Sequence, residues 1–277
     1  MTTPIPQHPS EIIKSIRNPR IKNFIQLQKG RERKKQQLFV VEGAREIHMA
    51  LDARYSFSHL FYCPAILGPD TFKKIIEKIG QKVILSEITS EIYQHIAYRK
   101  TSEGVIGWAV PQKHTLNKIR LAVNPLVLVI ESVEKPGNLG AILRTADAAG
   151  LDSVIICDPQ TDIYNPNVIR SSLGAVFTVP IGLASSAETI LWLKDHHMSI
   201  ICTSLKALVP YTQINFSVPS AIVMGTEATG LSTTWLKASD RNIIIPMRGQ
   251  VDSLNVSVSA GIVIFEAIRQ RKKVTLK

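Results

Sequence analysis

The chain has 277 residues, of which 45% are apolar, so it is long enough for one large or two medium domains and can bury a core. Its three cysteines, Cys63, Cys157 and Cys202, are an odd number without a close pair, which argues against a disulfide framework and against a zinc site. No apolar run is long enough to span a bilayer and residues 1–14 lack the apolar core of a signal peptide, so we expect a soluble, cytoplasmic protein.

The formal net charge of +11 is concentrated in the first part of the chain. Residues 1–110 contain 17 Lys and Arg against 10 Asp and Glu, residues 111–124 contain three against none, and residues 125–277 contain 13 against 12. A basic region of this kind favours a polyanion as partner, because each phosphate that it neutralises releases counterions. Nucleic acid is therefore the favoured partner, and solubility alone is the alternative.

Strands and helices alternate over residues 1–110. The first helix is predicted to start at Pro19, because Asn18 can cap it and proline is favoured at a first helical position. Further helices are predicted over residues 44–53, 68–80 and 86–98. Short strands are predicted over residues 38–43, 59–66, 81–86 and 100–111. The alternation indicates a small α/β domain over residues 1–110.

Residues 111–124 are polar and basic, which is typical of a linker; a loop inside one domain is the alternative.

The continuous apolar run at 125–133 is typical of a strand covered on both faces. Helices are then predicted over residues 137–150, 185–198, 232–239 and 253–273, and strands over 152–158, 199–205, 220–225 and 242–247. Residues 165–180 are predicted to form a short helix followed by a short strand. This order indicates a doubly wound parallel α/β domain over residues 125–277.

Three predicted loops follow the carboxyl ends of strands, where open α/β sheets bind ligands. In the first loop, Gly137 and Gly140 permit close backbone approach, and Asn138 can cap the following helix. Arg144 stands on that largely apolar helix, although an exposed helix face would explain it equally well. The glycines do not form the dinucleotide-binding pattern, which disfavours a dinucleotide-dependent enzyme.

The other two loops also combine small and polar residues. In residues 222–232, Gly225 and Gly230 flank Glu227, whose carboxylate could accept hydrogen bonds from backbone N–H groups or hold an arginine. A solvent-exposed glutamate in a turn is the alternative. In residues 245–261, Ser253 or Asn255 can cap the last predicted helix, which taken alone is ordinary capping.

Taken together, the three loops resemble the three motifs of the SpoU/TrmH group of SPOUT RNA methyltransferases in order and in spacing. The motifs are NxGxxxRxA at 138–146, GTEATGLS at 225–232 and IPMRGQVDSLNVSVSAG at 245–261. The resemblance covers roughly residues 125–270 and is specific, since three separate motifs match. The first 110 residues resemble more weakly the substrate-binding domain that often precedes this catalytic domain, through LFVVEGAREI at 38–47 and EGVIGWA at 103–109.

This resemblance implies a fold and a cofactor. It implies that residues 125–277 form a SPOUT domain whose C-terminal segment makes a deep trefoil knot, a feature almost absent from other proteins. S-adenosylmethionine would lie in the knot and be held largely by backbone groups. The implied cofactor-binding residues are Thr203, Leu205, Gly225, Ile245 and Leu254.

The implied activity is transfer of a methyl group to a ribose 2′-hydroxyl of RNA. The residues that match the polar motif positions, and that are assigned to catalysis, are Asn138, Arg144, Glu227, Ser253 and Asn255. Because a guanidinium stays protonated in proteins, we expect Arg144 to hold a phosphate and orient the hydroxyl. Glu227 is expected to orient Arg144 or a neighbouring loop, and Ser253 and Asn255 to position the ribose or phosphate. No metal is expected, because departure from a sulfonium needs no Lewis acid.

The resemblance also implies partners. A homodimer is expected through the catalytic domain, and the last helix is apolar nearly all round, as burial against a second copy or within its own domain would require. The basic first domain would bind structured RNA, with phosphate contacts expected from Arg17, Arg20, Lys22, Arg31, Arg33, Lys34 and Lys35. A separate basic domain suits a large folded target, so ribosomal RNA is favoured over tRNA. A non-catalytic RNA-binding assembly factor on the same fold is the remaining alternative.

Overall fold

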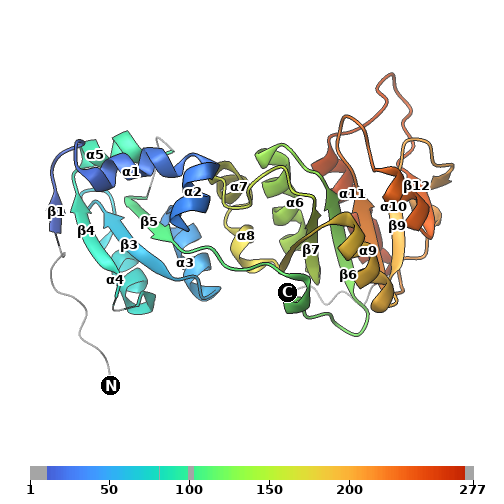
Figure 1. Cartoon of the computed structure of the whole chain (residues 1–277), viewed down its shortest axis with the longest axis horizontal. Helices are drawn as coiled ribbons and strands as arrows, with labels where there is room; N and C mark the ends of the chain where they lie inside the picture. The colour runs from blue at the N-terminus through green and yellow to red at the C-terminus, as the bar shows by residue number, and fades with distance from the viewer. Residues whose placement is uncertain (1–10, 81, 99–102, 272–277) are drawn as a thin grey trace. The chain divides into compact units, whose positions relative to one another are not determined.

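The computed structural model describes residues 11–80, 82–98 and 103–271, and the chain divides into two compact units (Figure 1). The first unit combines Met1–Gln112 with Tyr164–Thr178. The second combines Lys113–Ile163 with Val179–Lys277. The first unit therefore includes a short stretch from the middle of the chain, in addition to the region expected to form the first domain.

The first unit is built on a mixed sheet in the order β1-β4-β3-β5-β2. Its strands are β1 (Glu11–Ile13), β2 (Phe39–Glu42), β3 (Phe57–Tyr62), β4 (Ile84–Ile88) and β5 (Val105–Ala109). Its first five helices are α1 (Pro19–Leu27), α2 (Gly30–Gln36), α3 (Ala44–Asp52), α4 (Pro69–Lys78) and α5 (Ser90–Ile96). Strands β1, β4 and β3 are parallel, while β5 is antiparallel to β3 and β2. The predicted alternation is confirmed, and β1 is a further strand that the sequence pattern did not reveal.

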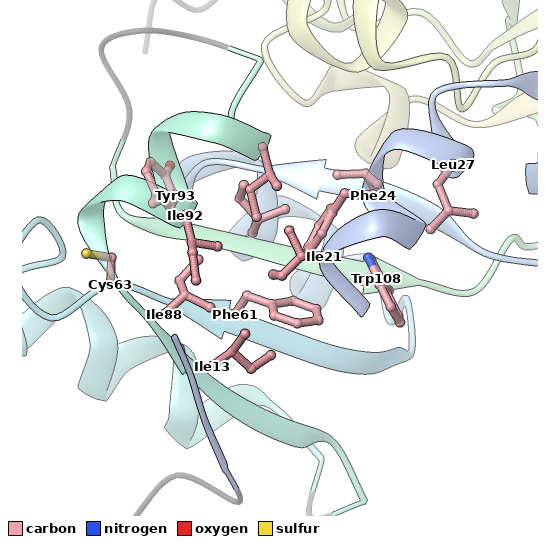
Figure 2. Close-up of a cluster of buried hydrophobic side chains, with 13 residues drawn as sticks. Ile13, Ile21, Phe24, Leu27, Phe61, Cys63, Ile88, Ile92, Tyr93 and Trp108 are labelled. Carbon is pink, nitrogen blue, oxygen red and sulfur yellow. The ribbon is translucent and has the colours of Figure 1, made fainter. Parts of the chain in front are cut away.

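Helices α1 and α5 and the sheet contribute side chains to one buried core in the first unit (Figure 2). Helix α1 begins as predicted, with Pro19 as its first residue and the Asn18 side chain accepting a hydrogen bond from Arg20 N at 2.9 Å. The ring of Phe24 lies 4.7 Å from that of Phe61 and 5.4 Å from that of Trp108, measured between centroids. This packing holds α1 on the sheet and leaves its polar face to solvent.

The stretch 164–178 forms two short helices, α7 (Pro166–Ser171) and α8 (Ala175–Thr178). The sequence pattern predicted a strand after the first helix, which is wrong for residues 175–178. Phe177 lies 5.1 Å from the ring of Tyr55, and Tyr164 stacks on Phe39 at 4.1 Å. Val176 and Phe177 are both buried, Phe177 within an aromatic cluster of the first unit. This tertiary packing overrides the strand preference of AVF.

The second unit has a seven-stranded sheet in the order β10-β12-β9-β11-β6-β7-β8. Its strands are β6 (Leu126–Glu131), β7 (Ser153–Cys157), β8 (Ile181–Ala184), β9 (Ser199–Thr203), β10 (Val209–Pro210), β11 (Ser220–Met224) and β12 (Arg241–Ile244). Its α-helices are α6 (Pro136–Ala149), α9 (Ser186–Asp195), α10 (Thr233–Ala238) and α11 (Val256–Gln270). All its strand pairings are parallel, so the predicted α/β fold with a parallel sheet is confirmed.

Helices cover both faces of this sheet. Val127 and Val129 of β6 belong to a core cluster with α9 and with Trp235 of α10. Side chains alternate along a strand, so Leu128 and Ile130, which are also buried, point to the opposite face. On that face α6 packs against β7, α11 against β11, and the two helices against each other. Burial on both sides explains why β6 is apolar throughout.

Residues 113–124, within the expected linker, lie on the second unit. A 3₁₀ turn (Leu116–Lys118) places Leu116, Ile119 and Leu121 against the core around Trp235. Leu183 N donates a hydrogen bond to His114 O at 2.7 Å, which extends the contact to the end of β8. In the described part of the chain, no helix has both the length and the apolarity needed to cross a bilayer.

Candidate functional site

Four loops meet at one edge of the second unit's sheet. Strand β11 pairs with both β6 and β9, and β9 pairs with β12. Because these strands are parallel, the loops that follow them emerge at the same edge. From β6, the next strands in the chain, β7 and β8, are added toward one end of the sheet. The later strands β9 and β12 are added toward the opposite end. The order therefore reverses at β6 and β11, and the carboxyl ends of strands at such a reversal are the usual ligand site of open α/β sheets.

A pocket of about 430 Å³, here called the large pocket, opens at this edge. Its volume lies within the range of about 300–1,000 Å³ that holds small-molecule ligands. Its wall is formed by residues from the segments 203–206, 224–236, 243–247 and 253–259. All five residues expected to bind a cofactor line it: Thr203, Leu205, Gly225, Ile245 and Leu254. The fold thus brings together side chains that are spread over fifty residues of sequence.

Gly225 allows a tight backbone approach in the wall of the large pocket. Thr226 N donates to Gly230 O at 3.2 Å, and Gly230 N donates to Thr226 O at 3.1 Å. A Cβ atom added to Gly225 would lie 2.2 Å from the carbonyl carbon and oxygen of Gly230, far inside van der Waals contact. A side chain at this position would therefore force the loop 225–230 to move.

Beside the large pocket, polar side chains converge on the carboxylate of Glu227. Glu227 Oε1 accepts hydrogen bonds from Asn138 Nδ2 at 3.0 Å and from Asn255 Nδ2 at 2.6 Å. Asn255 Nδ2 also donates to Asn138 Oδ1 at 3.1 Å, and Val256 N donates to Glu227 Oε1 at 3.4 Å. Lys135 Nζ forms an ion pair with Glu227 Oε2. We call Lys135, Asn138, Glu227 and Asn255 the Glu227 cluster.

The ionisation of the Glu227 cluster follows from these contacts. The hydrogen bond from Lys135, together with those from Val256 N and Asn138, holds the pKa of Glu227 below its ordinary value of 4.5. The same bond raises the pKa of Lys135 above 10.5. At neutral pH the cluster therefore contains one carboxylate, one ammonium group and two neutral amides. Glu227 is an acceptor here and not a proton donor.

A small pocket of about 80 Å³ lies over this cluster. Lys135, Asn138 and Glu227 line it. It shares residues 225–228 and Val256 with the large pocket. Two molecules bound in the two pockets would consequently lie against the same short loop.

The remaining polar motif residues are placed by α11 and the loop before it. Ser253 is exposed and lines the large pocket. Asn255 caps α11 as predicted, its Oδ1 accepting from Ser257 N at 3.0 Å. Asn138 does not cap α6 as predicted, because Pro136 starts that helix one turn earlier and Lys135 is the capping residue. This earlier start turns the Asn138 amide toward Glu227 instead of toward the backbone of its own helix.

Arg144 is not brought into this group. It is exposed on α6, lines neither pocket, and makes no hydrogen bond or ion pair with any described residue. Within one copy of the chain, the structure shows no hydrogen bond or ion pair between Arg144 and Glu227. The hydrogen bonds of Glu227 join the loop 225–230 to α6 and α11.

Two residues of this region were missed by sequence reasoning. Lys135 is one, and the other is Glu131, a buried carboxylate at the end of β6. Glu131 Oε2 accepts from Ser232 N at 2.8 Å, and Ser186 Oγ lies 3.4 Å from Glu131 Oε1. Ser186 Oγ also accepts from the indole N–H of Trp235 at 2.9 Å. Glu131 thus anchors the far end of the loop that walls the large pocket, and its only sequence signal was an acidic residue ending an apolar strand.

The basic residues expected to bind phosphate lie on and near α1 and α2. Those with exposed side chains are Arg17, Lys22, Arg31, Lys34 and Lys35. Arg20 is half-buried and forms an ion pair with Glu11. Arg33 corrects the prediction, because it is only 4% exposed and its guanidinium donates to Leu27 O and Gln28 O, both at 2.8 Å. Arg33 therefore satisfies the last carbonyls of α1 and is not available to RNA.

Among the described residues, no group of three or more His, Cys, Asp and Glu side chains could hold a metal ion. Within that same part of the chain Cys63, Cys157 and Cys202 are free and buried. Burial raises the pKa of the Cys157 and Cys202 thiols to about 12, so both are unreactive at neutral pH.

Two family models match the chain. The model of the SpoU rRNA Methylase family matches residues 125–265, and that of the MRM3-like substrate binding domain matches residues 18–107. Among curated proteins, the chain is 30% identical over 257 residues to the 23S rRNA (guanosine(2553)-2'-O)-methyltransferase RlmP of Bacillus subtilis (strain 168). That alignment covers 91% of this chain and 97% of the relative.

Solved structures give the same likeness over nearly the whole chain. An RNA 2'-O ribose methyltransferase superposes with a TM-score of 0.81 at 38% identity, covering 94% of this chain and 99% of the other. An AdoMet-bound rRNA methyltransferase from Sinorhizobium meliloti superposes with a TM-score of 0.86 at 28% identity, covering 93% and 97%.

Proposed function

The chain belongs to the SpoU rRNA methylase family, and from this premise we propose that it transfers a methyl group from S-adenosylmethionine to a ribose 2′-hydroxyl of ribosomal RNA. One observation carries the proposal: two of the three motif loops and the loop after β9 form a small-molecule pocket. This pocket shares a wall with the Glu227 cluster, to which the first motif contributes Asn138. Such a pair of neighbouring sites suits a cofactor and an acceptor that must meet. The Bacillus subtilis relative RlmP is a 23S rRNA methyltransferase, which supports the substrate class.

The large pocket fits S-adenosylmethionine. Leu205, Ile245 and Leu254 offer apolar walls for a flat aromatic base, and their loops offer backbone N–H and C=O groups. Gly225 lets the loop 225–230 close tightly in the pocket wall, because a Cβ there would overlap the Gly230 carbonyl. When bound, the cofactor supplies an electrophilic methyl group on a positively charged sulfonium. The similar rRNA methyltransferase from Sinorhizobium meliloti has AdoMet bound, which supports this assignment.

The Glu227 cluster positions the acceptor ribose. Glu227 remains ionised, and the hydrogen bonds that it accepts hold the amides of Asn138 and Asn255 in fixed orientations beside the shared wall. Ser253 lies exposed at the rim of the large pocket and adds a hydroxyl that can donate to or accept from the sugar. Together these groups orient the 2′-hydroxyl and exclude competing orientations, which is the contribution of positioning to catalysis.

A second copy of the chain completes the site. Arg144 lies exposed on α6, which packs beside α11. On α11 the apolar side chains Val258 and Phe265 are each 50% exposed, as expected for a face that a partner covers. A homodimer through α6 and α11 would bury these side chains and bring Arg144 toward the partner's pocket, where it would hold a phosphate of the RNA.

The first unit recruits the RNA. Its exposed cations on α1 and α2 lie close together in sequence, and phosphate contacts of this kind give affinity and orientation without reading the base sequence. The match to a substrate binding domain over residues 18–107 supports this role. A deep trefoil knot and a cytoplasmic location are further parts of the proposal. The knot is supported by family membership, and the location by the three free cysteines.

The proposal is tested by direct assay. Purified protein is incubated with methyl-labelled S-adenosylmethionine and, separately, with ribosomal RNA and tRNA, and methylated nucleotides are mapped by their resistance to alkaline cleavage. We expect label at a ribose of ribosomal RNA. Label on tRNA alone would replace the substrate class, and label on neither RNA, with cofactor binding intact in calorimetry, would favour the non-catalytic assembly factor.

A further inference from the structure

We propose that Lys135 is a substrate-positioning residue, whose ammonium group leaves Glu227 and binds the RNA phosphate next to the ribose that is methylated. The inference rests on the proposed function, and it adds a residue that lies outside the motif segments 138–146, 225–232 and 245–261.

Lys135 lies where an acceptor nucleotide would enter. It precedes α6 and lines the small pocket together with Asn138 and Glu227. The small pocket shares residues 225–228 with the large pocket, so a ribose placed over the Glu227 cluster lies against the cofactor-binding loop. A phosphodiester is attached to that ribose on either side, within the reach of a flexible lysine side chain.

The ion pair of Lys135 is easily exchanged. Its side chain is 68% exposed, and ion pairs in such surroundings contribute little to stability because water screens them. When the lysine leaves, Glu227 Oε1 keeps the hydrogen bonds from Asn138, Asn255 and Val256 N. Oε2 is then left to water, since the Glu227 side chain is 27% exposed. The amides of the cluster therefore stay in place while the cation moves from a carboxylate to a phosphate.

The charges around the pockets favour a phosphate as the new partner. Of the residues that line the small pocket in the described structure, Lys135 is the cation and Glu134 and Glu227 are the anions. Without the lysine, two carboxylates would face the negatively charged RNA backbone and oppose its approach. The ammonium group offsets this repulsion and, with three donors, suits a phosphate as a point-charge partner.

The variant Lys135→Gln tests the inference, with Lys194→Gln as a matched control. Lys194 is an exposed lysine of α9, on the opposite face of the sheet, so the control has the same change of charge without the site. Lys135→Gln is expected to raise the KM for RNA roughly tenfold, the scale of one hydrogen bond to a charged group. The slope of log KM against log salt concentration is also expected to decrease by about 0.7 to 0.9, which corresponds to the loss of one phosphate contact. Lys135→Arg should restore most of the loss.

The cofactor affinity separates the two anions that Lys135 could bind. We expect the Kd for S-adenosylmethionine, measured by calorimetry without RNA, to change less than about twofold, since this contact is to the RNA phosphate. A clear loss of cofactor affinity would assign the lysine to the methionyl carboxylate and overturn the inference. So would a KM and a salt dependence equal to those of Lys194→Gln. If the unmodified protein transfers no methyl group, the proposed function itself fails, and that result is distinct from an active enzyme in which Lys135 is dispensable.

Discussion

The large pocket and the Glu227 cluster share the loop 225–228 but are held together by different forces. Apolar side chains and close backbone contacts form much of the wall of the large pocket, with Gly225 at its tightest point. Hydrogen bonds from two amides and a lysine, all directed at one carboxylate, form the cluster. Cofactor binding should therefore depend on shape, and acceptor placement on a few polar contacts, so that single substitutions affect one and spare the other.

The largest effect is expected from Gly225→Ala. The new Cβ would overlap the carbonyl of Gly230, and overpacking of this kind costs about 1–3 kcal/mol. This corresponds to a loss of roughly ten- to a hundredfold in affinity for S-adenosylmethionine, measured by calorimetry. Gly249→Ala is the matched control, because a Cβ there meets no atom within 4 Å. Equal affinities of the two variants would contradict the role given to the shape of this loop.

Asn255→Ser should separate acceptor placement from cofactor binding. Serine also caps helices well, so α11 keeps its start, but its shorter side chain no longer reaches Glu227. Transfer, measured as kcat/KM for RNA, should fall about tenfold, since a hydrogen bond to a charged group is lost. The melting temperature and the cofactor affinity should stay near those of the unmodified protein. A fully active variant would remove Asn255 from the acceptor site.

Glu131→Ala is expected to weaken cofactor binding in the large pocket, although Glu131 does not line that pocket. Ser232 N would lose its buried acceptor, and the end of the loop that walls the pocket would loosen. We expect the KM for S-adenosylmethionine to rise about fivefold with little change in kcat. Glu131→Gln keeps an oxygen acceptor and should restore the KM. Failure of this rescue, with a melting temperature that falls equally in both variants, would leave Glu131 a role in stability alone.

The smallest effect concerns pH. The pKa of Glu227 is lowered from 4.5, so its hydrogen bonds are fully formed above that value and are lost only as the pH falls through the lower, folded-state pKa. The pKa of Lys135 is raised from 10.5, so its charge is fully present below that value and is lost only as the pH rises through the higher, folded-state pKa. Between about pH 5 and 10, therefore, neither Glu227 nor Lys135 changes its charge. The variant Glu227→Gln should lower the rate of methyl transfer across this range without altering the shape of the rate-against-pH profile. A step near neutral pH that disappears in this variant would contradict the assignment.

Local signals in the sequence were sufficient for much of the fold. The start of α1 at Asn18 and Pro19 and the end of α6 at Gly150 depend on hydrogen bonds and backbone angles within a few residues, so they could be predicted. The end of the expected helix–strand segment at 165–180 could not. These residues are helical because Phe177 is buried beside Tyr55 and Phe39, which are more than a hundred residues away in sequence.

The site divides in the same way. The motifs identified Asn138, Glu227 and Asn255, but only the structure joined them in one hydrogen-bonded group. Lys135 carries no local signal, and Glu131 only that of an acidic residue ending an apolar strand. The sequence does not reveal their roles, because their partners Glu227 and Ser232 lie 92 and 101 residues away. Arg33 is the opposite case, in which a local signal was misleading. The basic run predicted an RNA contact, but in the structure the Arg33 guanidinium donates hydrogen bonds to the carbonyls at the end of α1.

By itself, the sequence determined the class of the fold, the order of most of its strands and helices, and the three loops that carry the chemistry. It could do so because periodicity, capping and motif spacing are properties of neighbouring residues. Only the tertiary structure decided which of those loops share a wall, which carboxylate binds which donor, and which cations remain exposed. The reason is physical: a parallel sheet brings the ends of β6, β9, β11 and β12 to one edge, and the contacts made there join segments whose separation in sequence conceals them.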